Sequence, residues 1–299
     1  CDWSADVCSS DLLGRDGSLW VGLRYAGLAR MDRSRRVAER FKHDPADPGS
    51  LAEDQINCVM EDSKGRIWVG TVESGLSVLD RSTGKFRHYR HDPKNPATLS
   101  QDKIWWIFED RSGVIWIGTS KMGLNRLDPA TGKVTRYLHD PKNPTTISHD
   151  RVRHIMQSRD GSLWIGTNAG INRMDPAKGT FEHWKHNPKD PESLSNDRVT
   201  PIVEDPSGFF WVGTDDGLNR FDPATGKSKR YTVREGLADD GIQGMAMDAS
   251  GKLWVSTFKG ISRLDPKTGE VRNYSRRDGL AGVEFYMNAF HQAPDGELF

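Results

Sequence analysis

The chain of 299 residues has few cysteines, no excess of charge and no long apolar run. Forty-two basic and 42 acidic residues give a formal net charge of zero, so a field strong enough to recruit nucleic acid or an anionic membrane is absent. No apolar stretch approaches the roughly 18–20 residues that a membrane helix needs. These absences argue against nucleic acid as a partner and against a membrane helix within the sequence.

What the chain does have in quantity is glycine, proline and tryptophan: 30 Gly, 15 Pro and 10 Trp, with only 35% hydrophobic residues. This composition favours many short strands joined by tight turns around aromatic anchors, in place of long buried helices.

A tryptophan-containing unit recurs along the chain, with successive tryptophans 43 to 48 residues apart. The copies are DGSLWVGL (16–23), KGRIWVGT (64–71), SGVIWIGT (112–119), DGSLWIGT (160–167), SGFFWVGT (207–214) and SGKLWVST (250–257). The chain ends in DGELF, with Phe299 in the tryptophan position. A fixed period of this length indicates a repeat architecture.

Each unit contains four short runs suited to strands. In the fourth unit, DRVRHIMQSRDG (150–161) ends in a turn, SLWIGT follows, and a GxNRxDP run comes third; VTRYLHD (134–140) exemplifies the fourth run. Hairpin turns between such runs predict a four-stranded antiparallel sheet. Because one sheet cannot bury both of its apolar faces alone, we expect the sheets to stack radially, as an all-β β-propeller of about six blades.

The repeat consensus is Ile-x-x-Ile-x-Glu-Asp-x-x-Gly-x-Leu-Trp-Ile-Gly-Thr followed by Gly-Leu-x-Arg-x-Asp-Pro-x-Thr-Gly. It resembles the two-component regulator propeller repeat over residues 13–299. Kelch and WD40 repeats have similar periods, but the Gly-His and Trp-Asp pairs of WD40 blades are missing.

This resemblance implies a sensor. Propellers of the family are typically seven-bladed and extracytoplasmic, and a β-sandwich, a membrane helix and a histidine kinase or diguanylate cyclase usually follow. The resemblance therefore implies a periplasmic module of a receptor anchored in the inner membrane, with the signalling domains of the same parent chain as partners. A homodimer formed through those other parts stays open. Residues 278–299 resemble the closing blade of the family.

Residues that recur in every copy are interpreted as scaffold. We expect the tryptophans to pack between neighbouring sheets, and the Gly-Thr and Gly-Leu pairs to serve turns and close packing. The pairs His43-Asp44, His91-Asp92 and His139-Asp140 suggest metal ligands, but they occur once per blade and cannot converge on one ion. We interpret them as loop structure and expect neither a metal nor a cofactor.

Residues that differ between copies are the candidate ligand site. Two kinds of connection, from the second to the third strand and from the fourth strand to the next blade, are expected on one face. The first strand of each blade, eleven residues before the tryptophan, is expected nearest the axis. A mixed set of polar and aromatic groups there suits a small polar ligand, carbohydrate included. The candidates are Asn57, Trp105, Trp106, Arg153, His154, Gln243, Asn288, Tyr25, Lys121, Asp215, Phe258 and Lys259. Unconstrained variation of loops is the alternative.

No familiar catalytic motif occurs: the chain has no Gly-x-Ser-x-Gly elbow, no phosphate-cradling glycine loop and no cysteine with an evident histidine base. We therefore expect this chain itself not to be an enzyme. Two alternatives to a sensor stay open: a passive protein-interaction propeller, and a propeller lyase with His154 as general base.

The first twelve residues, CDWSADVCSSDL, resemble none of the repeats. They lack the basic start and apolar core of a targeting peptide. Their back-translation matches a common sequencing-library adaptor with one changed base at Ala5, so we interpret residues 1–12 as translated adaptor and residues 13–299 as the propeller, truncated at both ends. On this interpretation the first blade keeps three strands, and Cys58 is the one cysteine of the domain.

Overall fold

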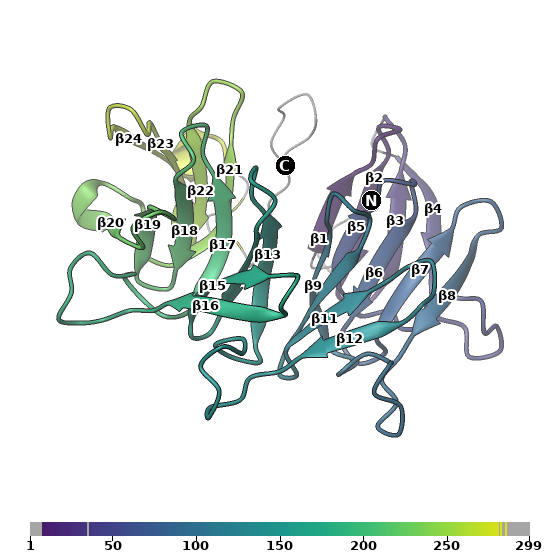
Figure 1. The fold of residues 1–299 in the computed structure, drawn as a ribbon. Helices are drawn as coiled ribbons and strands as arrows, with labels where there is room; N and C mark the ends of the chain where they lie inside the picture. The colour runs from purple at the N-terminus through teal and green to yellow at the C-terminus, as the bar shows by residue number, and fades with distance from the viewer. Residues whose placement is uncertain (1–7, 35, 281, 283–284, 286–299) are drawn as a thin grey trace. The chain divides into compact units, whose positions relative to one another are not determined.

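The structure is a computed structural model, and it describes residues 8–34, 36–280, 282 and 285. Within this part, 24 strands form six antiparallel sheets of four strands each (Figure 1). Every sheet consists of four consecutive strands paired in chain order. The predicted all-β fold with four-stranded units is therefore confirmed. Among the described residues there is no helix long and apolar enough to span a bilayer.

The chain divides into two compact units, and the first consists of Cys1–Leu138 with Asp150–Val152. It contains three sheets. Their strands are β1 (Cys8–Leu13), β2 (Leu19–Leu23), β3 (Gly27–Met31), β4 (Val37–Phe41), β5 (Ile56–Glu61), β6 (Ile67–Thr71), β7 (Leu76–Asp80), β8 (Lys85–Tyr89), β9 (Ile104–Glu109), β10 (Ile115–Thr119), β11 (Leu124–Leu127) and β12 (Val134–Tyr137).

The second unit consists of His139–His149 with Arg153–Phe299. Its sheets contain β13 (Val152–Gln157), β14 (Leu163–Thr167), β15 (Gly170–Asp175), β16 (Thr180–Trp184), β17 (Val199–Glu204), β18 (Phe210–Thr214), β19 (Gly217–Phe221), β20 (Ser228–Tyr231), β21 (Ile242–Met247), β22 (Leu253–Thr257), β23 (Gly260–Leu264) and β24 (Val271–Tyr274). Two single 3-10 turns, η1 (Val233–Glu235) and η2 (Arg276–Asp278), follow β20 and β24.

The first sheet has four strands, so the expectation of three is wrong. Cys8–Leu13 pairs antiparallel with β2, with Leu12 opposite Trp20 and Leu13 opposite Leu19. Strand pairing uses backbone N–H and C=O groups that every residue except proline carries in full, so this position accepts an unrelated sequence. Leu12 also packs against the apolar cluster that includes Trp20. The interpretation of residues 1–12 as adaptor stays a prediction.

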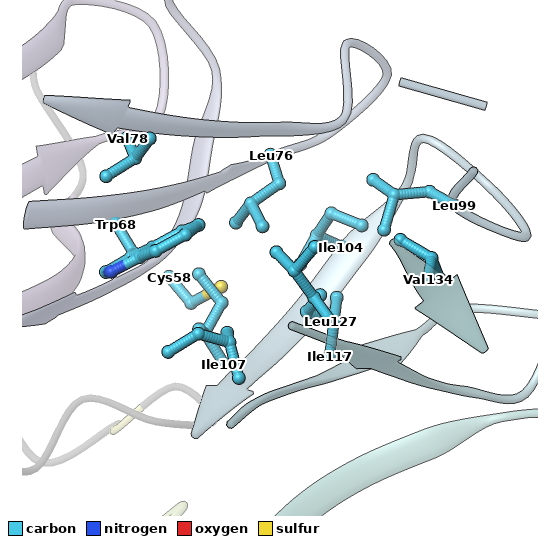
Figure 2. Close-up of a cluster of buried hydrophobic side chains, with 11 residues drawn as sticks. Cys58, Trp68, Leu76, Val78, Leu99, Ile104, Ile107, Ile117, Leu127 and Val134 are labelled. Carbon is cyan, nitrogen blue, oxygen red and sulfur yellow. The ribbon is translucent and has the colours of Figure 1, made fainter. Parts of the chain in front are cut away.

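Neighbouring sheets within a unit share their apolar faces. One cluster joins Trp68 and Leu76 of the second sheet to Ile104 and Ile117 of the third (Figure 2). Equivalent clusters join the first and second sheets, the fourth and fifth, and the fifth and sixth. Repeated tryptophans are part of these clusters, and the four that belong to them are at most 2% exposed: Trp20, Trp68, Trp164 and Trp211. Their predicted role as packing between sheets is confirmed.

A carboxylate six residues before the tryptophan holds its indole in three of the sheets. Nε1 of Trp68 donates to the carboxylate of Asp62 at 2.8 Å. In the same way Nε1 of Trp116 donates to Asp110 at 2.7 Å, and Nε1 of Trp254 donates to Asp248 at 2.7 Å. Gly14 and Ser158 occupy the equivalent positions before Trp20 and Trp164, and among the described residues these two indole nitrogens have no hydrogen-bond partner.

Glycine in the Trp-x-Gly-Thr segment allows the sheets to approach closely, as predicted. A Cβ at Gly70 would lie 2.5 Å from Sγ of Cys58 and 2.7 Å from Cγ2 of Ile104. Gly75, in the following loop, has φ of +82° and lies so near the carbonyl oxygen of Tyr89 that a Cβ would approach it to 2.4 Å. Gly70 is therefore required because a side chain would not fit. Gly75 is required for the same reason and also because its positive φ favours glycine.

Candidate functional site

The two kinds of connection proposed to carry the site do lie together at one edge of their sheets. In five of the six sheets, the glycine that ends the second-to-third-strand loop donates its N–H to an aspartate carbonyl in the connection that follows the sheet. Within the units these bonds join Gly27 to Asp54, Gly75 to Asp102, Gly123 to Asp150, Gly170 to Asp197 and Gly217 to Asp240, at 2.7–3.0 Å. This part of the prediction is confirmed.

The histidines of the His-Asp-Pro series are structural. Nδ1 of His43, His91, His139 and His186 lies 2.6–2.8 Å from a carbonyl oxygen eight residues further on. The following acid or amide accepts backbone N–H groups, as Asp92 does from Lys94 at 2.9 Å. These bonds give the series the loop role that the sequence predicted. Among the described residues no three metal-ligating side chains come together.

The position eleven residues before the tryptophan coincides with a β-bulge, which the sequence analysis missed. The register between first and second strands shifts around Asn57, around Trp105 and around Gln243, and between Val199 and Ile202 in β17. A bulge bends its strand and re-aims the side chain it carries, and bulges are common beside binding sites. The first strands therefore interrupt their pairing at the candidate positions.

Two of these bulge residues tie neighbouring sheets together. Nδ2 of Asn57 donates to the carbonyl oxygen of Ile104 at 2.9 Å, and Oγ1 of Thr200 donates to that of Ile242 at 2.9 Å. Asn57 thus bonds to the residue directly before Trp105, and these two candidates are brought together in the first unit. The amide of Asn57 has a structural bond, and its contact with a ligand stays a prediction.

The other candidates of the first unit differ in exposure. Trp105 and Trp106 are half-buried on β9, and the guanidinium of Arg151 lies 5.3 Å from the Trp105 ring centre. Tyr25, in the β2–β3 loop, is 62% exposed. Lys121, in the β10–β11 loop, is also exposed, and its backbone N–H donates to Gln101 at 3.0 Å. The loops of this unit thus carry an exposed aromatic ring and an exposed lysine, and two half-buried indoles lie on β9.

Two candidates of the second unit are buried, and a third, His154, is half-buried on β13. Arg153 and Gln243 are buried on β13 and β21. Nε of Arg153 donates to Oδ1 of Asn168 in the β14–β15 loop at 2.5 Å, which fixes the loop to the first strand. Burial lowers the pKa of His154 to about 3, so its imidazole is uncharged at neutral pH.

The remaining candidates lie in two loops of the second unit. Asp215, in the β18–β19 loop, forms an ion pair with Arg198. Phe258 and Lys259, in the β22–β23 loop, are exposed, and Nζ of Lys259 lies 2.7 Å from Asp239. The hydrogen bond that Lys259 donates to this carboxylate raises the pKa of Lys259. Asn288 lies outside the described residues.

A set of loop-binding residues near the ends of the fourth strands was missed by the sequence analysis. Arg136, His183 and Arg230 contact carbonyl oxygens of the long connection from the preceding sheet. The signal was present: these residues stand directly before Tyr137, Trp184 and Tyr231 in equivalent positions of the repeat.

The stacked four-stranded sheets, with their bulged first strands and clustered loops at one edge, define a β-propeller repeat protein. Four segments, residues 50–73, 98–121, 146–169 and 193–216, match the family model described as two component regulator propeller. The chain thus carries repeats of the two-component regulator propeller family, and the predicted resemblance is confirmed. No curated protein matches the sequence.

Solved structures with a similar fold include extracellular domains of one- and two-component systems and an enzyme. The extracellular domain of a hybrid two component system from B. thetaiotaomicron is 22% identical, with a TM-score of 0.80 over 97% of this chain and 38% of that one. A second extracellular domain from B. thetaiotaomicron, of a one component system, is 26% identical, with a TM-score of 0.59 over 98% of this chain and 40% of that one. Virginiamycin B lyase from Staphylococcus aureus, with quinupristin, is 16% identical, with a TM-score of 0.72 over 96% and 89% of the two chains. This chain spans less than half of the two extracellular domains.

Proposed function

We propose that this chain is the ligand-sensing propeller of an extracytoplasmic receptor, and that it binds a small polar ligand, carbohydrates included, at the edge that carries the variable loops. The observation that carries the proposal is the set of two-component regulator propeller repeats. It is supported by the similarity in fold to an extracellular domain of a hybrid two component system.

The character of the loop edge supports a polar ligand. Tyr25 and Phe258 are 62% and 50% exposed, and Lys121 and Lys259 stand in equivalent loops. Aromatic faces pack against sugar rings, and a charged group in the same unit, Lys121 with Tyr25 or Lys259 with Phe258, fixes polar substituents. Residues in the interior of the repeat are nearly invariant between copies, whereas these are not.

The proposal extends to signalling. A ligand shifts an equilibrium between two arrangements only by its differential affinity for them. We expect the bound propeller to favour one placement against a following β-sandwich, which passes the change through the inner membrane to a histidine kinase or diguanylate cyclase.

Binding to the purified chain tests the proposal. Calorimetric titration with a panel of oligosaccharides and other small polar compounds should find one class that binds and is recovered unchanged after long incubation. Tyr25→Ala combined with Trp105→Ala, both in the first unit, should abolish that binding and leave the fold intact. Lys64→Ala, in the exposed turn at the opposite end of β5 and β6, is the matched control and should bind normally. Unaltered affinity in the double variant would refute the proposed site.

A lyase is the second candidate, because virginiamycin B lyase shares the fold over most of both chains. In that case the ligand should be consumed, and His154→Ala should stop its loss. The low pKa of His154 speaks against this role, since a general base works best when its pKa lies near the operating pH. A passive interaction platform would instead capture proteins and ignore every compound in the panel.

A further inference from the structure

In the third and fifth sheets, an arginine of the fourth strand holds the long connection that precedes the sheet. These residues are Arg136 and Arg230, each directly before a tyrosine near the end of the strand. Nε of Arg230 donates to the carbonyl oxygen of Ser193 at 3.0 Å, and its Nη2 donates to Asp190 O, Ser193 Oγ and Leu194 O at 2.9–3.2 Å. Arg136 makes the same four contacts with Asn95, Thr98 and Leu99 at 2.8–3.0 Å. The connection thus forms an oxygen-lined cradle for a guanidinium group.

The connection before the second sheet, residues 43–52, has the same conformation. The Asp44 N–H donates to Ser50 Oγ at 2.9 Å, and the Asn187 N–H donates to Ser193 Oγ at 2.9 Å. In both connections the serine N–H donates to the carbonyl oxygen three residues earlier, and the histidine Nδ1 meets the leucine carbonyl oxygen, at 2.8 Å for His43. The carbonyl oxygens of Asp47, Ser50 and Leu51 are therefore arranged as in the cradle of Arg230.

Here the clamping residue is a histidine. His88 lies opposite Ser77 in the β7–β8 pairing, as Arg230 lies opposite Asn219 in the β19–β20 pairing. Its Nε2 lies 3.3 Å from Pro48 O, and its Nδ1 lies 2.9 Å from Ser77 Oγ. An imidazole is shorter than an arginine side chain and has no Nη2, so the cradle is left lining a groove of about 560 Å³.

The electrostatics of the groove suit a cation that can spread several N–H donors. Burial lowers the pKa of His88 and the nearby Arg90 adds to this, despite the bond to Pro48, so the ring carries no charge at neutral pH. The carboxylate of Asp44 lines the groove, while Asp47 is paired with Lys85 at 2.7 Å. Arg90, exposed at the rim, is the one opposing charge among the lining residues.

We propose that residues 43–52 and His88 form a guanidinium-binding subsite, which takes the group that Arg136 and Arg230 supply from within the chain. A guanidinium presents five N–H donors in a planar fork, and hydrogen bonds from a charged donor are about twice as strong as neutral ones. The subsite contains none of the residues proposed for the ligand site, so the proposal does not depend on that site. Its ligand is a free guanidinium compound or an arginine side chain of a peptide.

The first test compares three chains in thermal unfolding with low-millimolar guanidinium chloride against sodium chloride of equal ionic strength. The wild type should gain stability. His88→Arg should start at a higher midpoint and gain less than the wild type, because its own guanidinium fills the cradle of residues 43–52. Arg230→Ala is the positive control: it should start lower and regain part of its loss. An equal response of His88→Arg and wild type would overturn the proposal, even if Arg230→Ala fails to fold.

The second test identifies the source of the group by calorimetry. Nα-acetyl-arginine amide should bind the wild type and bind His88→Arg about tenfold more weakly or worse, which corresponds to about 1.4 kcal/mol. The citrulline analogue, which has the same shape without the charge, should not bind. Arg90→Ala should bind the arginine amide more tightly, because it removes the opposing charge. Guanidinium binding without arginine-amide binding assigns the subsite to free small compounds, and equal binding of arginine and citrulline amides contradicts it.

Discussion

The second sheet, β5–β8, and the fourth sheet, β13–β16, have the same strand order, and each buries a tryptophan at the equivalent position of the repeat. They hold the indole of that tryptophan in different ways. In the second, Nε1 of Trp68 donates to the buried carboxylate of Asp62 at 2.8 Å, and Tyr89 is its ring neighbour at 5.9 Å. In the fourth, Ser158 replaces the acid, and Trp164 contacts three rings, Trp184 at 5.3 Å, Phe210 at 4.7 Å and Phe221 at 6.0 Å.

This difference shows two ways of fixing one ring. A buried donor without a partner costs free energy, of the order of 1–3 kcal/mol, whereas each aromatic pair contributes about 0.5–1.5 kcal/mol beyond its buried area. The fourth sheet therefore offsets the orphaned Nε1 with aromatic packing. The second sheet relies on a polar network centred on one carboxylate, which makes it the more sensitive of the two to acid and to substitution of that residue.

Removing either ring should have the largest effect. Trp68→Ala and Trp164→Ala should each lower the free energy of unfolding by about 3–5 kcal/mol, because each deletes a fully buried aromatic and leaves a cavity between sheets. Urea titration followed by fluorescence of the remaining tryptophans measures this. Tyr25→Ala, which truncates an exposed ring, should change the unfolding free energy by less than about 0.5 kcal/mol. A small effect at Trp164 would contradict the packing argument.

The second-largest effect is expected for Asp62→Ala, which should destabilise the protein more than the equivalent substitution in the fourth sheet. It removes the acceptor of Trp68 Nε1, of Arg66 Nε at 2.6 Å and of two backbone N–H groups, so we expect a loss of about 2–4 kcal/mol. Ser158→Ala, at the equivalent position, should cost about 1 kcal/mol or less, since the hydroxyl bonds only to Asp160 and Ser162. Equal losses would show that the polar network of the second sheet contributes nothing.

Acid should affect the second sheet through the same carboxylate. Burial alone would raise the pKa of Asp62, but hydrogen bonds from Trp68 and Arg66 outweigh it and hold the pKa below its usual value. A folded-state pKa below the unfolded value of about 3.9 adds stability at higher pH, and this is lost as pH falls through the folded pKa. The stability difference between wild type and Asp62→Asn should therefore narrow between about pH 5 and about pH 2. A constant difference across that range would contradict the shift.

The sequence predicted the architecture because the copies of the repeat within the chain can be compared with one another. Positions that every copy shares, such as Trp68 and Gly70, are those that the packing between sheets requires. It could not predict the bulges at Asn57 and Trp105, because a register shift of one residue leaves no mark in composition or period. It also missed the clamp of Arg230, because its partners are backbone oxygens about 40 residues away and only the recurrence of Arg or His before the last aromatic of the strand points to it.

The smallest expected effect is an increase in the free energy of unfolding. Ser158→Asp combined with Asp160→Lys gives the fourth sheet the Asp-x-Lys-Gly pattern of residues 62–65 and supplies an acceptor to Trp164 Nε1. The second change removes a carboxylate that would repel the first. We expect about 1 kcal/mol of added stability, the net contribution of one hydrogen bond. Asp160→Lys alone should be destabilising, because Asp160 caps the turn through the Ser162 N–H at 2.9 Å. If the double variant is no more stable than wild type, aromatic packing alone fixes the Trp164 ring, and the two sheets differ more than the shared backbone suggests.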